Sequence, residues 1–253
     1  MRAGARGPEE GAEPRAEEAA PRRSATGPAR TGLWLLGLCG VLSPVFLVAA
    51  TVLGVRFRPG FDHVTYTISE LYEVGAPNAG GLMVLFTTYH ALVIPFALGL
   101  HLALPESRRG WIGPAMLAAA GLLGIPLGAW ARCDPGCFGA TTVRGQMHAV
   151  LVLLTVPLVY GGMIAVWSRL RRHPAWRGVA RYTLATAVVG ILFGLGMTPF
   201  VQGPYAGLLE RISVAIMVQW YAVMGIVVMR EARRRETTGG AGAREASTGT
   251  VHA

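Results

Sequence analysis

The chain has 253 residues, of which 52% are hydrophobic and 15% are charged. Soluble domains usually carry about 25% charged residues, so this composition excludes an ordinary water-soluble globule and favours a membrane protein. The net charge is +9, and all 23 basic residues are arginine. Without lysine, the chain has neither a Schiff-base lysine nor a phosphate-loop lysine. Its three cysteines are too few for a disulfide-dense secreted scaffold.

The two ends of the chain differ in composition from its middle. Residues 1–31 are rich in Ala, Gly, Pro, Glu and Arg and contain no apolar run. Residues 230–253 are similar and end in a stretch rich in Thr, Gly and Ala. Segments of this kind cannot bury enough apolar surface to fold, so we predict two disordered cytoplasmic tails around a transmembrane domain at residues 32–229.

The middle of the chain contains six apolar stretches that are long enough to cross a membrane. A hydrocarbon core of about 30 Å needs about 20 helical residues, and these runs lack the alternation of a membrane β-strand. The first stretch follows a long polar tail, which argues against a cleavable signal peptide. We therefore predict an all-α integral membrane bundle of six transmembrane helices, at residues 32–55, 79–104, 111–131, 146–167, 182–201 and 208–229.

The arginines that flank these spans predict the orientation of the bundle. Basic residues next to a span are retained on the cytoplasmic side. If the N-terminus is inside, fourteen flanking arginines are cytoplasmic and five are outside, namely Arg56, Arg58, Arg132, Arg144 and Arg211. The loop 169–181 alone carries five arginines and no acid, and anionic lipid is a second partner for it. We predict a multi-pass protein of the cell membrane with both termini cytoplasmic.

Proline and glycine mark the interior of the spans. Each of the first five spans contains a proline that should kink the helix and free a carbonyl group, and an internal cavity is one consequence. These prolines are Pro44, Pro95, Pro126, Pro157 and Pro199. Two pairs of glycines have the four-residue spacing that lets helices approach closely, namely Gly124 with Gly128 and Gly190 with Gly194.

Two polar side chains lie deep within the apolar spans. His90 is near the middle of the second span and Gln219 is near the middle of the sixth. Hydrogen bonds between helices would satisfy both side chains. His101 lies about three turns from His90 on the same helix, whereas an axial haem pair needs facing helices, so we expect no haem.

The outer end of the predicted bundle collects most of the remaining polar residues. Its first loop, at 56–78, has 23 residues and is too long to be a simple connector. Ile68, Leu71 and Tyr72 have the i, i+3, i+4 spacing of a short interfacial helix. The wetter sides of this helix would carry Ser69, Glu70 and Glu73. Acids and bases at the three loop mouths would either form an ion-paired cap or build a functional site.

The second outer loop contains the most specific local motif, Cys133-Asp-Pro-Gly-Cys137. Asp-Pro-Gly favours a tight turn that brings the two cysteines together on an oxidising face, so we predict a disulfide between Cys133 and Cys137. A metal site built from this pair with Asp134 and His148 has plausible ligand types but lacks a second cysteine pair. We therefore expect no metal. The third cysteine, Cys39, is in the first span and is expected to pack there.

Four short motifs in this order resemble a known family. They are Thr67-Ile-Ser-Glu-Leu71, Gly75-Ala-Pro-Asn-Ala79, the cysteine motif and Gly145-Gln-Met-His148. Together they resemble the domain-of-unknown-function 998 family of six-helix prokaryotic membrane proteins, over nearly everything except the tails. The resemblance implies a six-helix bundle but carries no established activity. It also implies polar hallmark residues at Ser69, Glu70, Pro77, Asn78, Asp134 and His148.

Three functions fit these observations. The first is binding or moving a lipid or other amphiphile at an outward-facing polar site. The second is an interfacial lipid hydrolase or transferase in which His148 is the acid or base, Asp134 or Glu70 orients it, and Ser69 or water is the nucleophile. The third is an accessory membrane subunit. Membrane lipid is the expected partner, and we expect no nucleic acid and no cofactor. The candidate binding residues are Asp62, Ser69, Glu70, Asn78, Asp134 and His148.

Overall fold

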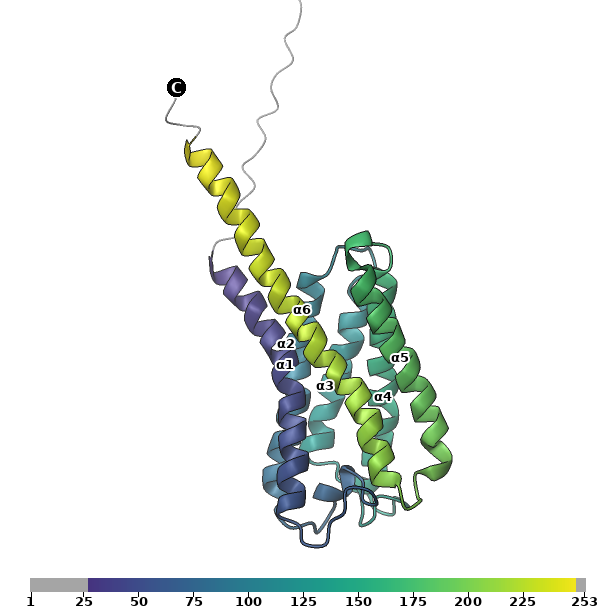
Figure 1. The fold of residues 1–253 in the computed structure, drawn as a ribbon. Helices are drawn as coiled ribbons and strands as arrows, with labels where there is room; N and C mark the ends of the chain where they lie inside the picture. The colour runs from purple at the N-terminus through teal and green to yellow at the C-terminus, as the bar shows by residue number, and fades with distance from the viewer. Residues whose placement is uncertain (1–26, 249–253) are drawn as a thin grey trace, which may run out of the picture.

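A computed structural model describes residues 27–248 of the chain. Its six long helices form one bundle (Figure 1), and each is long and apolar enough to cross a membrane. The predicted all-α fold with six spans is confirmed. The helices are α1 (Gly27–Arg56), α2 (Ala79–Ala103), α3 (Ile112–Ala129), α4 (Val143–Leu170), α5 (Arg177–Met197) and α6 (Ala206–Thr248).

Three short 3₁₀ helices lie in the connections between these helices. They are η1 (Ser69–Tyr72), η2 (Pro174–Trp176) and η3 (Thr198–Phe200). The α1–α2, α3–α4 and α5–α6 connections lie together at the lower end of Figure 1, which we call the η1 end. The α2–α3 and α4–α5 connections form the opposite end, which we call the far end.

The helix bounds differ from the predicted spans most clearly at the two ends of the chain and at Pro199. α1 begins at Gly27, inside the predicted N-terminal tail, and α6 continues past residue 230 to Thr248. Residues 1–26 and 249–253, where the rest of the predicted tails falls, lie outside the described residues. Pro199 does not kink α5, because α5 ends at Met197 and the proline belongs to η3. A proline at the first turn of a helix loses no hydrogen bond, which explains this position.

Glycines set the close approach of two helix pairs. A Cβ atom on Gly225 of α6 would lie 2.6 Å from the carbonyl oxygen of Gly37 in α1. Between α3 and α2, a Cβ on Gly128 would lie 2.7 Å from the backbone nitrogen of Thr87, and one on Gly124 would overlap the ring of His90. At Gly128 the backbones of α3 and α2 are therefore in direct contact, whereas Gly124 makes room for the His90 ring.

The second predicted glycine pair, in α5, divides into two roles. A Cβ on Gly190 would lie 2.4 Å from the hydroxyl of Tyr160 in α4, so this glycine does allow a close helix contact. A Cβ on Gly194 would meet no atom within 4 Å. Of this pair, only Gly190 therefore lies close to α4. One turn later, at Gly194, no neighbouring side chain or backbone packs against α5.

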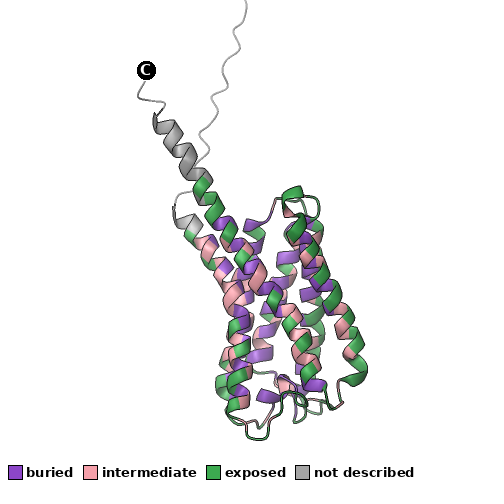
Figure 2. Ribbon diagram, viewed as in Figure 1, coloured by how far each residue is buried: buried purple, intermediate pink, exposed green. Residues whose placement is uncertain are grey.

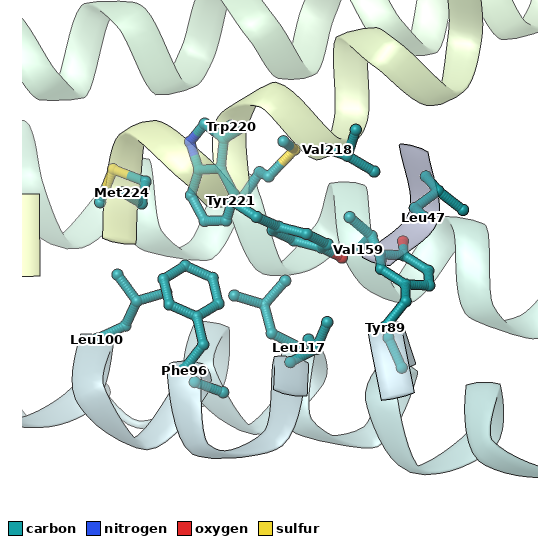
Figure 3. Packing of buried hydrophobic residues seen from close by; sticks show 14 of the residues in the cluster. Leu47, Tyr89, Phe96, Leu100, Leu117, Val159, Val218, Trp220, Tyr221 and Met224 are labelled. Carbon is teal, nitrogen blue, oxygen red and sulfur yellow. The ribbon is translucent and has the colours of Figure 1, made fainter. Parts of the chain in front are cut away.

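Buried apolar side chains of α1, α2, α3, α4 and α6 pack against one another inside the bundle (Figure 3). Phe96 of α2 packs edge-on against Trp220 and Tyr221 of α6, with ring centroids 6.3 and 5.7 Å apart. The indole nitrogen of Trp220 donates a hydrogen bond of 3.1 Å to the hydroxyl of Thr183 in α5. Lipid tails are as apolar as these side chains, so interdigitated packing and such interhelical hydrogen bonds hold the bundle together.

α5 is the least buried wall of the bundle (Figure 2). Its buried residues are Ala180, Thr183, Thr186, Ala187 and Gly190, and none of them lies among its last seven residues, 191–197. The hydroxyl of Tyr182 also bonds to Gln219 of α6, which confirms an interhelical hydrogen bond for that predicted polar residue. The part of α5 nearer the far end therefore packs against the neighbouring helices. The part near the η1 end, residues 191–197, contains no buried residue.

Candidate functional site

A cavity of about 1050 Å³ occupies the η1 half of the bundle. α4, α5 and α6 form most of its wall, and η1 closes it at the η1 end. Along α4 it reaches from His148 to Ile164, which is roughly 24 Å at 1.5 Å per residue. Small-molecule pockets usually measure about 300–1,000 Å³, so this space can hold a ligand with a long chain.

The cavity opens sideways between α4 and α5. Some residues that line it are at the same time exposed on the bundle surface, including Leu153 of α4 at 72% and Leu195 of α5 at 68%. Both side chains are apolar and lie well inside helices that are apolar enough to cross a membrane. Because the surface of such helices faces lipid, the opening connects the cavity with the hydrocarbon region of the bilayer.

Polar groups lie at two levels of this mainly apolar cavity. At the η1 end, the lining includes Thr67, Ser69, His148 and Glu210. Deeper in the bundle, it includes Thr155, Tyr160 and Ser213. A long apolar wall with a polar end matches the division of an amphiphile into chain and head group.

The short helix η1 is confirmed, but the prediction that its acids lie on a wet surface is wrong. Glu70 and Glu73 are each only 8% exposed. The Glu70 carboxylate accepts hydrogen bonds from the backbone nitrogen of Thr67 at 2.6 Å and from its hydroxyl at 2.7 Å. Glu70 thereby satisfies the backbone donor that precedes η1, as in a helix capping box, and this local bonding makes its burial possible.

Glu73 joins the first loop to the cysteine loop. Its carboxylate forms an ion pair of 2.6 Å with Arg58 and accepts a hydrogen bond of 2.7 Å from the backbone nitrogen of Gly136. The backbone nitrogen of Val74 also donates to the carbonyl of Cys133 at 3.0 Å. The two loops thus form one structure at the η1 end.

Cys133 and Cys137 are bonded to each other, as predicted, with their Cα atoms 4.9 Å apart. The turn between them needs left-handed backbone, with φ of 80° at Gly136 and 57° at Cys137. Glycine adopts such a conformation readily, which explains why it precedes the second cysteine. Cys137 also lines the cavity, so the disulfide loop forms part of its closed end.

Asp134 is bonded to the beginning of α4. Its carboxylate accepts hydrogen bonds from the backbone nitrogens of Thr141 and Thr142, at 2.7 and 2.9 Å, and from the Thr142 hydroxyl at 2.6 Å. The Thr142 hydroxyl in turn caps the nitrogen of Gly145. These hydrogen bonds, with that from the Thr142 side chain foremost, lower the pKa of Asp134 to about 2. The carboxylate therefore stabilises the positive end of the α4 dipole.

His148 lines the cavity and is bonded to the backbone rather than to a carboxylate. Its Nδ1 lies 2.9 Å from the carbonyl oxygen of Ala131. A carbonyl oxygen only accepts, so Nδ1 carries the proton and Nε2 is the remaining polar atom of the neutral ring. The ring centroid of Tyr72 lies 6.5 Å from that of His148, which places η1 beside it. Ser69 lines the same cavity, but its hydroxyl makes no hydrogen bond within the described part of the chain.

The remaining predicted site residues, Asp62 and Asn78, are exposed and do not line the cavity. Asp62 accepts a hydrogen bond of 2.8 Å from the backbone nitrogen of Thr65, and interactions with the Thr65 side chain and backbone lower its pKa. Asn78 precedes α2 with a left-handed backbone, φ 59°. The structure therefore gives both residues a local backbone role and brings Ser69 and His148, but not Asp62, Glu70, Asn78 or Asp134, onto the cavity wall.

Glu210 is not among the predicted site residues. It lies in the first turn and a half of α6, lines the cavity and accepts a hydrogen bond from the backbone nitrogen of Ile68. The neighbouring Arg211 instead donates to the carbonyl oxygens of Tyr66 and His63, at 2.7 and 2.9 Å. A carboxylate just inside an apolar span was the signal that could have identified Glu210.

Two hydroxyl groups deeper in the cavity lack partners. Thr155 and Tyr160 are 8% and 7% exposed, and neither side-chain oxygen makes a hydrogen bond of good geometry, although the Tyr160 hydroxyl lies near Ser213. Buried polar groups are normally satisfied because leaving them unbonded costs about 1–3 kcal/mol. Both residues line the cavity, so a ligand oxygen placed there would satisfy them.

The fold and this site define a multi-pass α-helical membrane protein with a laterally open cavity. The model of the family described as protein of unknown function (DUF998) matches residues 41–227, which is well over half of the chain. The chain therefore belongs to this family, and the predicted resemblance is confirmed. No curated protein and no solved structure matches the chain.

Proposed function

We propose that this protein binds a single membrane amphiphile. Its chain would lie between α4, α5 and α6, and its head group would lie inside the cavity, next to η1. The observation that carries the proposal is the cavity of about 1050 Å³ with apolar walls, one polar end and an opening toward the bilayer. A cavity that served a water-soluble ligand would not need an apolar opening at the depth of Leu153 and Leu195.

The polar end of the cavity supplies groups for a head group. Ser69 and His148 offer a hydroxyl and a ring nitrogen, and Glu210 offers a carboxylate. The disulfide and the Arg58–Glu73 ion pair hold the loops that carry or flank these groups. A rigid polar end combined with an incompletely packed α5 lets the head group be positioned while the chain enters from the side.

We place the η1 end on the outer face of the cell membrane. The far end carries a larger share of the flanking arginines, including Arg171 and Arg172, which are exposed. Retention of basic flanks in the cytoplasm supports this orientation. In it, the polar end of the cavity lies near the outer surface and both chain ends lie inside.

Two glycine substitutions in α5 test the proposal with a photoactivatable fatty-alcohol probe. Gly194 lines the cavity and its Cβ position is open, so Gly194→Phe should fill the cavity without clashing with the backbone. The matched control is Gly196→Phe, because Gly196 is also open but does not line the cavity. We expect probe labelling of α4 and α5 to fall at least about tenfold in the first variant, equivalent to about 1.4 kcal/mol, and to persist in the second.

The proposal is contradicted if labelling is equal in the wild type and in both variants, since the probe would then lie on the lipid-facing surface. It is also contradicted if the labelled peptides lie outside the cavity wall. Retained helical content and an unchanged unfolding temperature for Gly194→Phe would show that a loss of labelling reflects a filled cavity.

A further inference from the structure

The charges around the cavity are distributed unequally. Among the described residues that line it, Glu210 is the one carboxylate, and no arginine is present. The neutral polar groups are mainly hydroxyls and the rings of His90 and His148. The cavity wall therefore presents a carboxylate and no guanidinium to an anionic head group.

Three arginines of the η1 end have hydrogen-bond or ring partners outside the cavity wall. Arg58 is bonded to Glu73 and to the carbonyl of Glu70. Arg211, although next to Glu210 in sequence, donates to loop carbonyls, and its guanidinium lies 5.9 Å from the centroid of the Phe61 ring. The Arg144 guanidinium lies over the Trp130 ring, 5.4 Å from the ring centroid. None of these side chains lines the cavity.

Aromatic rings line the same end of the cavity as Glu210. The rings of Tyr72 and Phe86 lie 4.5 Å apart and both border the cavity. Glu210 accepts a hydrogen bond from the backbone nitrogen of Ile68, which precedes η1, and Tyr72 is the last residue of η1. Burial and, to a lesser degree, the charge of Glu210 raise the pKa of the Tyr72 phenol. A carboxylate accompanied by aromatic rings is the combination that recognises ammonium groups.

We propose that the cavity selects amphiphiles whose head group carries a positive charge, with Glu210 as the counter-ion and the aromatic rings of Tyr72 and Phe86 beside the ammonium. This inference rests on the proposed function, because it names the class of amphiphile that the same cavity takes. Neutral amphiphiles with a hydroxyl head bind more weakly, and phosphate-headed ones bind weakest.

Competition against the photoactivatable fatty alcohol tests the selectivity. Full-length protein in nanodiscs of digalactosyldiacylglycerol, whose head group carries neither an ammonium nor a phosphate group, receives the probe and equal amounts of one competitor: hexadecyltrimethylammonium, hexadecanol or hexadecyl phosphate. We expect the ammonium compound to displace the probe at about tenfold lower concentration than the alcohol, and the phosphate to require more than either.

Glu210→Gln should remove the preference for the ammonium compound while labelling by the alcohol probe persists. The amide oxygen of glutamine still accepts from the Ile68 nitrogen, so the fold is preserved and the persistent labelling shows it. Glu106→Gln is the matched control, because Glu106 is exposed in the α2–α3 connection at the far end. A second variant, Ser213→Arg, adds a cation one turn along the same face of α6 and should make the phosphate compound the best competitor.

The outcomes separate the two proposals. If the probe labels the cavity but the three compounds compete equally, or the phosphate competes best in the wild type, the charge selectivity is wrong and amphiphile binding stands. If Glu210→Gln and the control behave alike, Glu210 is not the counter-ion and the inference is likewise overturned. If the probe does not label the cavity at all, the proposed function itself fails.

Discussion

Arg169 shows how much structure a single side chain can organise at the far end. It is 6% exposed, and its guanidinium donates to the carbonyl oxygens of Pro105, Gly110 and Leu104, at 2.6, 2.8 and 2.8 Å, and to that of His101 at 3.1 Å. Sequence reasoning counted it only as one of five arginines that set the orientation. In the structure, it joins the end of α4 to the whole α2–α3 connection.

We predict that Arg169→Met lowers the unfolding temperature of the purified protein. The substitution keeps much of the apolar volume but leaves four carbonyl acceptors without a donor, and the expected loss is about 3 kcal/mol. Arg172→Met is the control, because it removes the same charge from an exposed position on the same connection. Equal unfolding temperatures for the two variants would show that the carbonyls of the α2–α3 connection do not need Arg169.

The Asp134 carboxylate leads to a prediction about how the stability of the protein changes at acidic pH. Its pKa is depressed to about 2 in the folded protein, mainly by hydrogen bonds from Thr142, whereas an unfolded aspartate titrates near 4. The stability that its carboxylate contributes is therefore complete above about pH 4 and is lost as the pH falls from about 4 to about 2. We expect the unfolding temperature of the wild type to exceed that of Asp134→Asn by a constant margin at neutral pH, and this margin to shrink below pH 4.

Comparison with Asp134→Asn isolates this carboxylate from others that titrate in the same range, such as Asp62. A margin that stays constant down to pH 2.5 would mean that the aspartate is not held by Thr142 in the folded protein. A margin that grows with acid would contradict the direction of the pKa shift itself.

The polar residues of the site were only partly predictable. Residue type and loop position were enough to identify Ser69 and His148, which do line the cavity. They were not enough to separate these two from Glu70 and Asp134, whose carboxylates are satisfied by threonines of their own loops. Which partner a carboxylate finds depends on backbone turns a few residues away, and hydropathy contains no information about them.

At the scale of the helices, glycine contacts determine which pairs are close. The α2–α3 pair is the clearest case, because Gly128 lies against the backbone of Phe86 and Thr87. The sequence predicted such contacts from four-residue spacing alone. Spacing identifies the helical face but not whether another helix lies on it, which is why Gly124 and Gly128 pack closely and Gly194 does not.

We predict that Gly128→Ala destabilises the bundle. Its Cβ atom would lie 2.7 Å from the Thr87 nitrogen, so α2 and α3 must separate, and overpacking of this kind costs about 1–3 kcal/mol. Gly81→Ala is the matched control, since a Cβ at Gly81 meets no atom within 4 Å and alanine favours a helix. Thermal unfolding should show a lower midpoint for the first variant alone. A lower midpoint for both variants would mean that flexibility, not close contact, is what these glycines provide.

At the scale of the whole molecule, six spans follow directly from the lengths of the apolar runs. Their existence was predictable because a membrane helix needs only composition and length. The lateral opening was not, because it results from α5 being buried on one side only up to Gly190. The hydropathy of one helix does not show which part of that helix a neighbouring helix will cover.

The orientation of the whole molecule gives a further prediction. A reporter fused in the loop 171–176 should be cytoplasmic, because the arginines around it would be retained there.

Alkylation of intact cells without reduction should leave both Cys133 and Cys137 unmodified, since an outer, oxidising face would keep them bonded. A reporter that is active outside the cell would reverse the orientation, and alkylation of either thiol would place the cysteine loop on the reducing side.

The sideways opening between Leu153 and Leu195 would determine the route by which the proposed amphiphile exchanges. A sixteen-carbon chain that passed through water would lose about 0.8 kcal/mol per methylene, or about 13 kcal/mol in all. Through an opening at the depth of the acyl chains, the ligand moves from lipid to protein without that loss. Occupancy then follows the ligand's abundance among the bilayer lipids, and a compound almost insoluble in water exchanges without a carrier.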